Sequence, residues 1–153
     1  MTLPEQERER FCQVLHHSRT SLYRLAFSIT RNSSDAQEAV AEAVCRAYER
    51  YPQLREKEKL PRWLLKITAN EARRLCQRRG RTVSLDDLPT EPAIPGRETG
   101  DDTLWQAVQT LPRDQREAVV LFYYEDLPTE EIARIVGTSP GAVRVRLSRA
   151  REK

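Results

Sequence analysis

Apolar residues recur three or four positions apart along most of the chain, which is the spacing of an amphipathic helix. In the first half this pattern predicts one helix over 11–30, a second that ends at Tyr51 before Pro52, and a third that begins near Pro61. Few stretches show the alternation of apolar and polar residues that a half-buried strand requires. The pattern therefore predicts an all-α fold.

Polar residues between these helices contain helix-start signals. The break at 32–34 ends the first helix, and Ser34 is expected to cap the second. Asp35 would then lie in the first turn of that helix, and Gln37 would complete a capping box. The charged segment Gln53–Lys59 has no turn glycine and is expected to form the loop before the third helix.

Two short helical patterns at the C-terminal end are separated by a polar turn over 137–139. Thr129 is expected to cap the first of these helices, and Gly137 to end it in the left-handed conformation. Ser139 can cap the second helix, and Pro140 suits its first position, where no backbone donor is needed. This arrangement is typical of a helix-turn-helix.

The last helix has an apolar face and a cationic face. Val143, Leu147 and Ala150 share the apolar face. The other positions include Arg144, Arg146, Ser148, Arg149 and Arg151. A recognition helix presents such side chains to the major groove of DNA, where arginine donates to guanine edges and to phosphates. The alternative is an ordinary helical hairpin with a solvated arginine face. The caps, the turn and the charge pattern all favour a DNA-binding helix-turn-helix instead.

Composition and charge divide the chain into three parts. Its 153 residues, 39% hydrophobic and 32% charged with a mean hydropathy of −0.70, suffice for one domain or two small ones. We expect two small helical domains, over 1–80 and 111–153, of which the second is the helix-turn-helix. An acidic segment rich in proline and glycine joins them over 81–110 and is expected to be a flexible linker, with or without a specific acidic role.

Several function classes are not supported by the sequence. No apolar run is long enough to span a membrane and the first residues lack a secretory pattern, so we expect a cytoplasmic protein without membrane insertion. Cys12, Cys45, Cys76 and the pair at 16–17 lack metal-ligand spacing, so neither a metal nor a disulfide framework is expected. With no phosphate loop and no nucleophile–base arrangement, we expect neither a cofactor nor an enzyme.

Specific motifs occur in both halves. The N-terminal helices contain L-Y-x-L-A, D-A-x-E-x-V-x-E and W-L-x-x-I-x-x-N. The C-terminal part contains L-P-x-x-x-R-E-A-V, E-I-A and G-x-V-x-x-R-L-x-R-A-R. In combination these motifs resemble the second and fourth conserved regions of sigma factors of the extracytoplasmic-function (ECF) group. The resemblance covers all of the chain except the first dozen residues and the linker.

The resemblance implies a promoter-specificity subunit whose partners are bacterial core RNA polymerase and promoter DNA. The N-terminal domain would bind the polymerase clamp and open the promoter near its minus-ten element. The C-terminal domain would read the minus-thirty-five element, and the acidic linker would thread through the polymerase channel. An anti-sigma factor is a further candidate partner, which the sequence does not identify.

The same resemblance assigns residues to these roles. The positions on the clamp-binding helix are Asp35, Glu38, Glu42, Val44, Arg46 and Tyr48. The loop Gln53–Lys59 matches the segment that captures a flipped minus-ten base. The positions on the helix beside it are Arg62, Trp63, Lys66, Asn70, Arg73 and Arg74. The base-facing positions of the recognition helix are Arg144, Ser148 and Arg149, whereas Arg146 and Arg151 are assigned to phosphates or to the fold.

The C-terminal half alone also resembles the DNA-binding module of many response regulators. A helix-turn-helix regulator that occupies DNA without joining the polymerase is therefore the alternative function. The N-terminal motifs disfavour it, because a plain repressor needs neither the W-L-x-x-I-x-x-N helix nor the acidic clamp-like helix.

Overall fold

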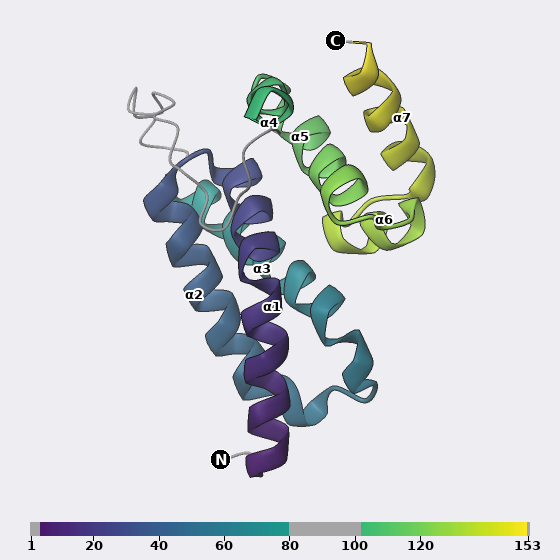
Figure 1. The fold of residues 1–153 in the computed structure, drawn as a ribbon. Coiled ribbons are helices and arrows are strands. Elements are labelled where there is room, and N and C mark those ends of the chain that lie inside the picture. The colour runs from purple at the N-terminus through teal and green to yellow at the C-terminus, as the bar shows by residue number, and fades with distance from the viewer. Residues whose placement is uncertain (1–3, 80–101, 153) are drawn as a thin grey trace.

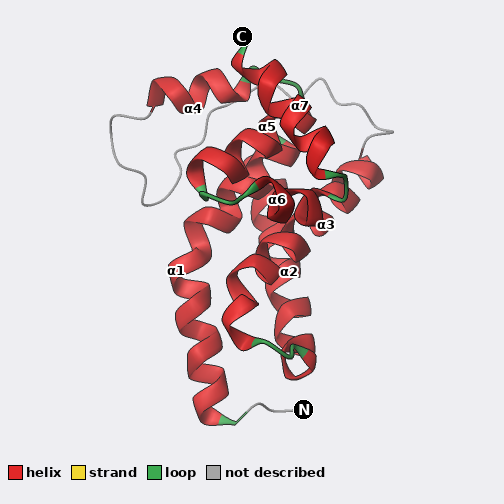
Figure 2. Ribbon diagram, turned by 90° about the vertical axis from the view of Figure 1, so that its right-hand side faces the viewer, coloured by secondary structure: helices red, strands yellow, loops and turns green. Residues whose placement is uncertain are grey.

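The structure, a computed structural model, describes residues 4–79 and 102–152, and these residues are almost entirely helical (Figures 1 and 2). No strand occurs within the described ranges. The all-α prediction is therefore confirmed, and the helices form two units on either side of residues 80–101.

Three long helices make up the N-terminal unit. They are α1 (Glu5–Thr30), α2 (Ser33–Arg50) and α3 (Leu60–Arg79), with the short 3₁₀ turns η1 (Tyr51–Gln53) and η2 (Lys57–Lys59) before α3. Each helix packs against the other two. The inner face of α2 is built from small residues, and all of them are buried: Ala36, Ala39, Ala43 and Ala47. Small side chains at this spacing allow α2 to lie close to α1 and α3.

Shorter helices make up the C-terminal unit. They are α4 (Asp102–Gln109), α5 (Arg113–Val119), the π-helical turn η3 (Val120–Tyr124), α6 (Thr129–Val136) and α7 (Pro140–Arg151). Helices α6 and α7 form the helix-turn-helix, and both pack on α5. The apolar centre of the C-terminal unit contains Leu121, Ile132, Val143 and Leu147, each at most 3% exposed.

Two of the four predicted cap features are correct. Gly137 ends α6 with φ = 78°, and the Ser139 hydroxyl accepts a hydrogen bond from the Ala142 amide at 3.1 Å. The prediction for Ser34 was wrong, because the extended residue Asn32 caps α2 and accepts from the amide of Asp35 at 2.9 Å.

The cap predicted for α6 was also wrong. Thr129 is the first residue inside the helix, and Pro128 takes the capping position without a side-chain hydrogen bond. Acidic residues in the first turn, Glu130 and Glu131, remain to complement the amide end of the helix.

Part of the predicted linker is helical. Residues 102–109 form α4, whereas 81–101 lie outside the described residues. The apolar positions Leu104, Trp105 and Val108 have helical spacing, and Trp105 is only 1% exposed. The acidic composition of the segment concealed this short periodic stretch.

The two units pack against each other through apolar contacts and a buried cation. The Trp105 ring lies 6.3 Å from the Phe27 ring of α1, measured between ring centroids. Arg116 of α5 is buried, and its Nε donates to the Ser28 carbonyl of α1 at 2.6 Å. A single cluster of buried apolar residues runs through both units.

We predict that Gly137→Ala lowers the free energy of unfolding by about 1 kcal/mol, because an L-residue is disfavoured at positive φ. A Cβ there would meet no atom within 4 Å, so the cost would come from the backbone alone. Chemical denaturation measures it, with Gly141→Ala as the control, because Gly141 lies inside α7 where alanine is tolerated. Equal stability of the Gly137 variant and the parent would contradict the prediction.

Candidate nucleic-acid and polymerase interfaces

Helix α7 presents a polar outer face to solvent. Arg144, Ser148 and Arg149 are exposed, while Val143 and Leu147 on the opposite face are buried. One Arg144 amino group donates to the Thr129 hydroxyl at 3.4 Å, which connects the two helices of the motif. The structure therefore brings the three predicted base-facing residues together on one accessible surface.

The other two arginines of α7 are held at its flanks. Arg146 is half-buried, with its Nε 3.9 Å from a carboxylate oxygen of Asp114. Arg151 donates from Nε to the Tyr123 hydroxyl at 2.8 Å and lies near the Phe122 ring. Side chains tethered to α5 and η3 are less free to reach base edges than those on the outer face.

Val145 is a candidate that sequence reasoning missed. It lies on α7 next to Arg144, about 100° around the helix, and its side chain points away from the core with 48% exposure. An apolar side chain that is about half exposed on this face is available for contact, and apolar side chains in the major groove contact the methyl group of thymine. The available signal was that Val145 falls outside the stripe of Val143, Leu147 and Ala150.

A second polar surface lies on α3. Arg62, Lys66 and Asn70 recur every four residues and are exposed, and Arg73 follows on the same side. We call these four residues the α3 face. Trp63 is half-buried against the apolar cluster, and Arg74 donates to Glu71 at 3.3 Å. The six predicted residues thus share one helix, but only four of them share this face.

Two arginines of the α3 face are paired with the C-terminal unit. An Arg73 amino group donates to the Glu117 carboxylate of α5 at 2.8 Å, and Glu117 is 3% exposed. An Arg62 amino group lies 3.4 Å from the Glu131 carboxylate of α6. Sequence spacing could not reveal these pairs, because they join residues far apart in the chain.

The loop before α3 is fastened to the N-terminal unit. The Lys57 ammonium group donates to the Tyr51 carbonyl at 2.6 Å and lies 4.1 Å from the centre of the Tyr51 ring. Tyr51 is buried against Phe11 of α1, and burial raises the pKa of its hydroxyl. The predicted base-capturing segment Gln53–Lys59 is therefore anchored through Lys57.

The residues predicted to bind the polymerase lie on two sides of α2. Glu38, Glu42 and Arg46 line a cleft of about 160 Å³ towards α3. Within this cleft Arg46 pairs with Glu71, its Nε lying 2.7 Å from the carboxylate. Arg74 contacts the same carboxylate, so Glu71 connects a predicted polymerase residue with a predicted DNA residue.

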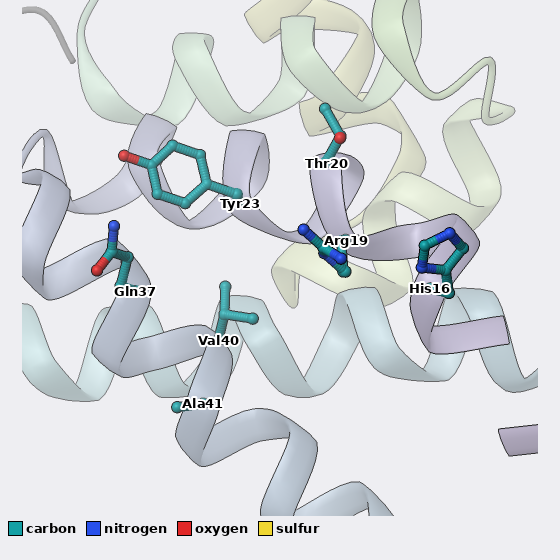
Figure 3. A pocket seen from close by; sticks show the side chains of 7 residues that line it. All are labelled: His16, Arg19, Thr20, Tyr23, Gln37, Val40 and Ala41. Carbon is teal, nitrogen blue, oxygen red and sulfur yellow. The ribbon is translucent and has the colours of Figure 1, made fainter. Parts of the chain in front are cut away.

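The remaining polymerase candidates are less exposed. Val44 and Tyr48 are half-buried on the α1 side of α2, and Asp35 is 8% exposed. On that side the two helices border a groove of about 500 Å³ (Figure 3). The residues that line it are His16, Arg19, Thr20, Tyr23, Gln37, Val40 and Ala41.

Two negative findings apply to the described ranges alone. Within residues 4–79 and 102–152, no group of three or more His, Cys, Asp or Glu side chains is placed to hold a metal ion. Across that same part of the chain, no helix is both long and apolar enough to cross a membrane.

Comparison with known proteins matches both halves of the chain. Residues 14–82 match the family described as Sigma-70 region 2, and residues 101–153 match Sigma-70, region 4. The chain is 33% identical over 130 residues to RNA polymerase sigma factor SigV of Bacillus subtilis, covering 84% of this chain and 78% of SigV. It is 31% identical over 138 residues to ECF RNA polymerase sigma factor EcfG of Rhodopseudomonas palustris, covering 87% and 76% of the two chains.

A solved structure shows the same fold. It contains the sigma factor RpoE in complex with the anti-sigma factor NepR from Bartonella quintana. The TM-score is 0.76 at 28% sequence identity, and the match covers 93% of this chain and 92% of that one. The likeness therefore extends across both helical units.

Proposed function

This chain belongs to the ECF group of the sigma-70 family, and we propose that its two helical units divide promoter recognition between the minus-ten and minus-thirty-five elements. As a promoter-specificity subunit it joins bacterial core RNA polymerase and directs it to promoter DNA. The observation that supports the division best is that each unit matches a separate sigma region and carries its own exposed polar helix face.

The outer face of α7 is our candidate for reading the minus-thirty-five element. Arg144 and Arg149 can each donate two hydrogen bonds to a guanine edge. Ser148 and Val145 lie between these arginines on the helix surface, where they can make smaller polar and apolar contacts with base edges. Arg146 and Arg151, held at the flanks by Asp114 and Tyr123, are better placed for phosphates on either side of the groove.

The α3 face and the loop Gln53–Lys59 are our candidates for the minus-ten element. Three cations and one amide on a helix face suit the backbone of a separated strand, and Trp63 lies one position away from Arg62. Lys57 anchors the loop Gln53–Lys59, to which it belongs, by its hydrogen bond to the Tyr51 carbonyl. This anchor would limit the conformational entropy that the loop loses when it captures a base.

The exposed side of α2 is our candidate for the polymerase. Its acidic pair, Glu38 and Glu42, is exposed on the side towards α3, whereas Val44 and Tyr48 add half-buried apolar surface on the side towards α1, and charged and apolar surface together suit a protein interface. We further propose that the protein acts in the cytoplasm as a regulatory subunit without catalytic turnover of its own. An anti-sigma factor is a proposed further partner, because the related RpoE was solved in complex with one.

Run-off transcription with purified core polymerase on a library of genomic promoter fragments tests the function as a whole. We expect specific transcripts that depend on the added protein, and their start sites would give the promoter motif. A protein that binds these fragments but never yields a transcript with core polymerase would support the regulator alternative instead.

We predict that Glu38→Lys combined with Glu42→Lys weakens binding to core polymerase on the order of tenfold, since charge reversal at an interface costs affinity. Fluorescence anisotropy of the labelled chain titrated with core polymerase measures it. The control is Glu5→Lys with Glu9→Lys, the same charge change on exposed positions of α1. Undiminished binding of the α2 variant would refute the assignment.

Replacing Gln53–Lys59 with a Gly/Ser segment should abolish promoter opening while leaving closed complexes intact, because stacking and cation contacts contribute roughly 1–3 kcal/mol per base. Permanganate reactivity of thymines reports opening, and a gel-shift assay at low temperature reports closed complexes. An unchanged thermal unfolding transition would show that the variant remains folded. If thymines still react, the base-capturing site lies elsewhere.

In α7, Arg144→Ala or Arg149→Ala should each relax the preference at one base pair by about 1–3 kcal/mol. Val145→Ala should relax a preference for thymine by a smaller amount. Arg146→Ala should instead lower affinity on all sequences and reduce the salt dependence by about one ion. Binding of the full chain to single-base variants of the minus-thirty-five element distinguishes these outcomes, and a uniform loss in all four variants would show that α7 acts only as an electrostatic anchor.

A further inference from the structure

The N-terminal end of α1 lies against the turns η1 and η2, which frame the loop Gln53–Lys59 (Figure 1). Glu7, Phe11 and Val14 are buried or half-buried on one side of α1, whereas the positions between them are exposed. The match to Sigma-70 region 2 begins only at residue 14. The contacts that Glu7 and Phe11 make near the loop therefore come from residues that precede the matched region.

Phe11 fixes the start of the loop by aromatic packing. Its side chain is 2% exposed, and its ring meets the Tyr51 ring edge-on with 5.3 Å between centroids. It also meets the Tyr48 ring edge-on at 5.4 Å. Edge-to-face pairs of this kind add stabilisation beyond the burial of their surface. Tyr51 is itself completely buried, so the loop begins at a fixed point.

Tyr51 passes this constraint to the middle of the loop. Its carbonyl oxygen accepts from the Leu54 amide at 3.0 Å and from the Lys57 ammonium group at 2.6 Å. Lys57 also lies over the Tyr51 ring, and its Nζ is 4.0 Å from a carboxylate oxygen of Glu7. The loop positions between these contacts remain exposed, where an incoming base can reach them.

We propose that the first turns of α1, through Glu7 and Phe11, hold the loop Gln53–Lys59 in the conformation that captures a minus-ten base. This inference rests on the proposed role of the loop. Glu7 and Phe11 are positioning residues, because they act through Lys57 and Tyr51 and need not touch DNA. A loop that is ordered before the strands separate loses less conformational entropy on capture, so the promoter opens faster than it would with a free loop.

Amide hydrogen exchange in the free chain tests whether Phe11 orders the loop. Phe11→Leu keeps an apolar side chain and removes both ring contacts. The matched control is Phe27→Leu, the same substitution at an equally buried position near the other end of α1. The reporters are the Leu54 and Lys59 amides, each of which donates to the carbonyl three residues earlier at 3.0 Å. Both amides should exchange about fivefold faster in the Phe11 variant than in the control, and equal exchange would overturn the proposal.

Opening kinetics test whether this order serves base capture. With core polymerase bound, the time course of permanganate reactivity at minus-ten thymines gives the opening rate, and a gel shift at low temperature gives the affinity of the closed complex. Phe11→Leu should open about threefold more slowly than both the parent and Phe27→Leu, with unchanged closed-complex affinity. A purely structural role would slow both variants alike. Equal opening rates, or a loss of closed-complex affinity that accounts for the slower rate, would contradict the proposal.

Glu7→Gln tests the charged contact with Lys57, and Glu9→Gln is its control, because it makes the same change at an exposed position two residues further along α1. The Glu7 variant should open about twofold more slowly than the control, a smaller effect than that of Phe11→Leu, since a partly exposed ion pair is weak. Equal rates in the two glutamate variants would remove Glu7 from the proposal.

Failure of the proposed function gives a different result. If replacing Gln53–Lys59 with a Gly/Ser segment leaves the thymines reactive, the loop is not the capture site. If that replacement abolishes opening while Phe11→Leu opens at the rate of its control, the loop captures the base without support from α1, and only the inference about Glu7 and Phe11 fails.

Discussion

The arrangement of the two units depends on one buried cation. Arg116 donates from Nε to the Ser28 carbonyl of α1 and from an amino group to the Leu111 carbonyl at 2.8 Å. Ser28 lies in the last turn of α1, where carbonyls lack helical partners and carry partial negative charge. Burial, and then repulsion from Arg31, lowers the pKa of Arg116 to about 10, so the group remains charged at neutral pH. Because its two acceptors belong to different units, Arg116 sets how α5 meets α1, and with it the approach of Glu117 to Arg73.

Local sequence signals predicted the helices well because they act within a few residues. Periodicity identified the all-α fold, and the turn residues Gly137 and Ser139 adopt the predicted roles. The errors arose where two local signals competed. Asn32 and Ser34 are both good capping residues. The cap is the last extended residue before the helix, and in this structure that residue is Asn32. At α4, acidic composition suggested a linker, whereas burial of Trp105 against Phe27 stabilises a helix there.

The arrangement of the candidate site residues was predicted in part, for a comparable reason. Helical spacing places Arg144, Ser148 and Arg149 on one face of α7, and the structure agrees. Pairing between distant segments carries no such local pattern. The contacts of Arg62 and Arg73 with the C-terminal unit, and the shared carboxylate of Glu71, depend on how whole helices pack. Family motifs identify which residues carry a function, but they do not say what those residues contact when the partner is absent.

Arginine supplies the N-terminal partner of the ion pairs between the two units. Its guanidinium group is always charged and pairs equally well with carboxylates and with phosphates. Partly exposed ion pairs such as Arg62 with Glu131 contribute little free energy, typically about 0–1 kcal/mol each, so they can be exchanged at low cost. Burial of the Trp105 side chain, which is 1% exposed, adds a larger stabilising contribution to the packing of the two units. The buried apolar side chains, more than the partly exposed ion pairs around them, therefore account for the packing of the two units.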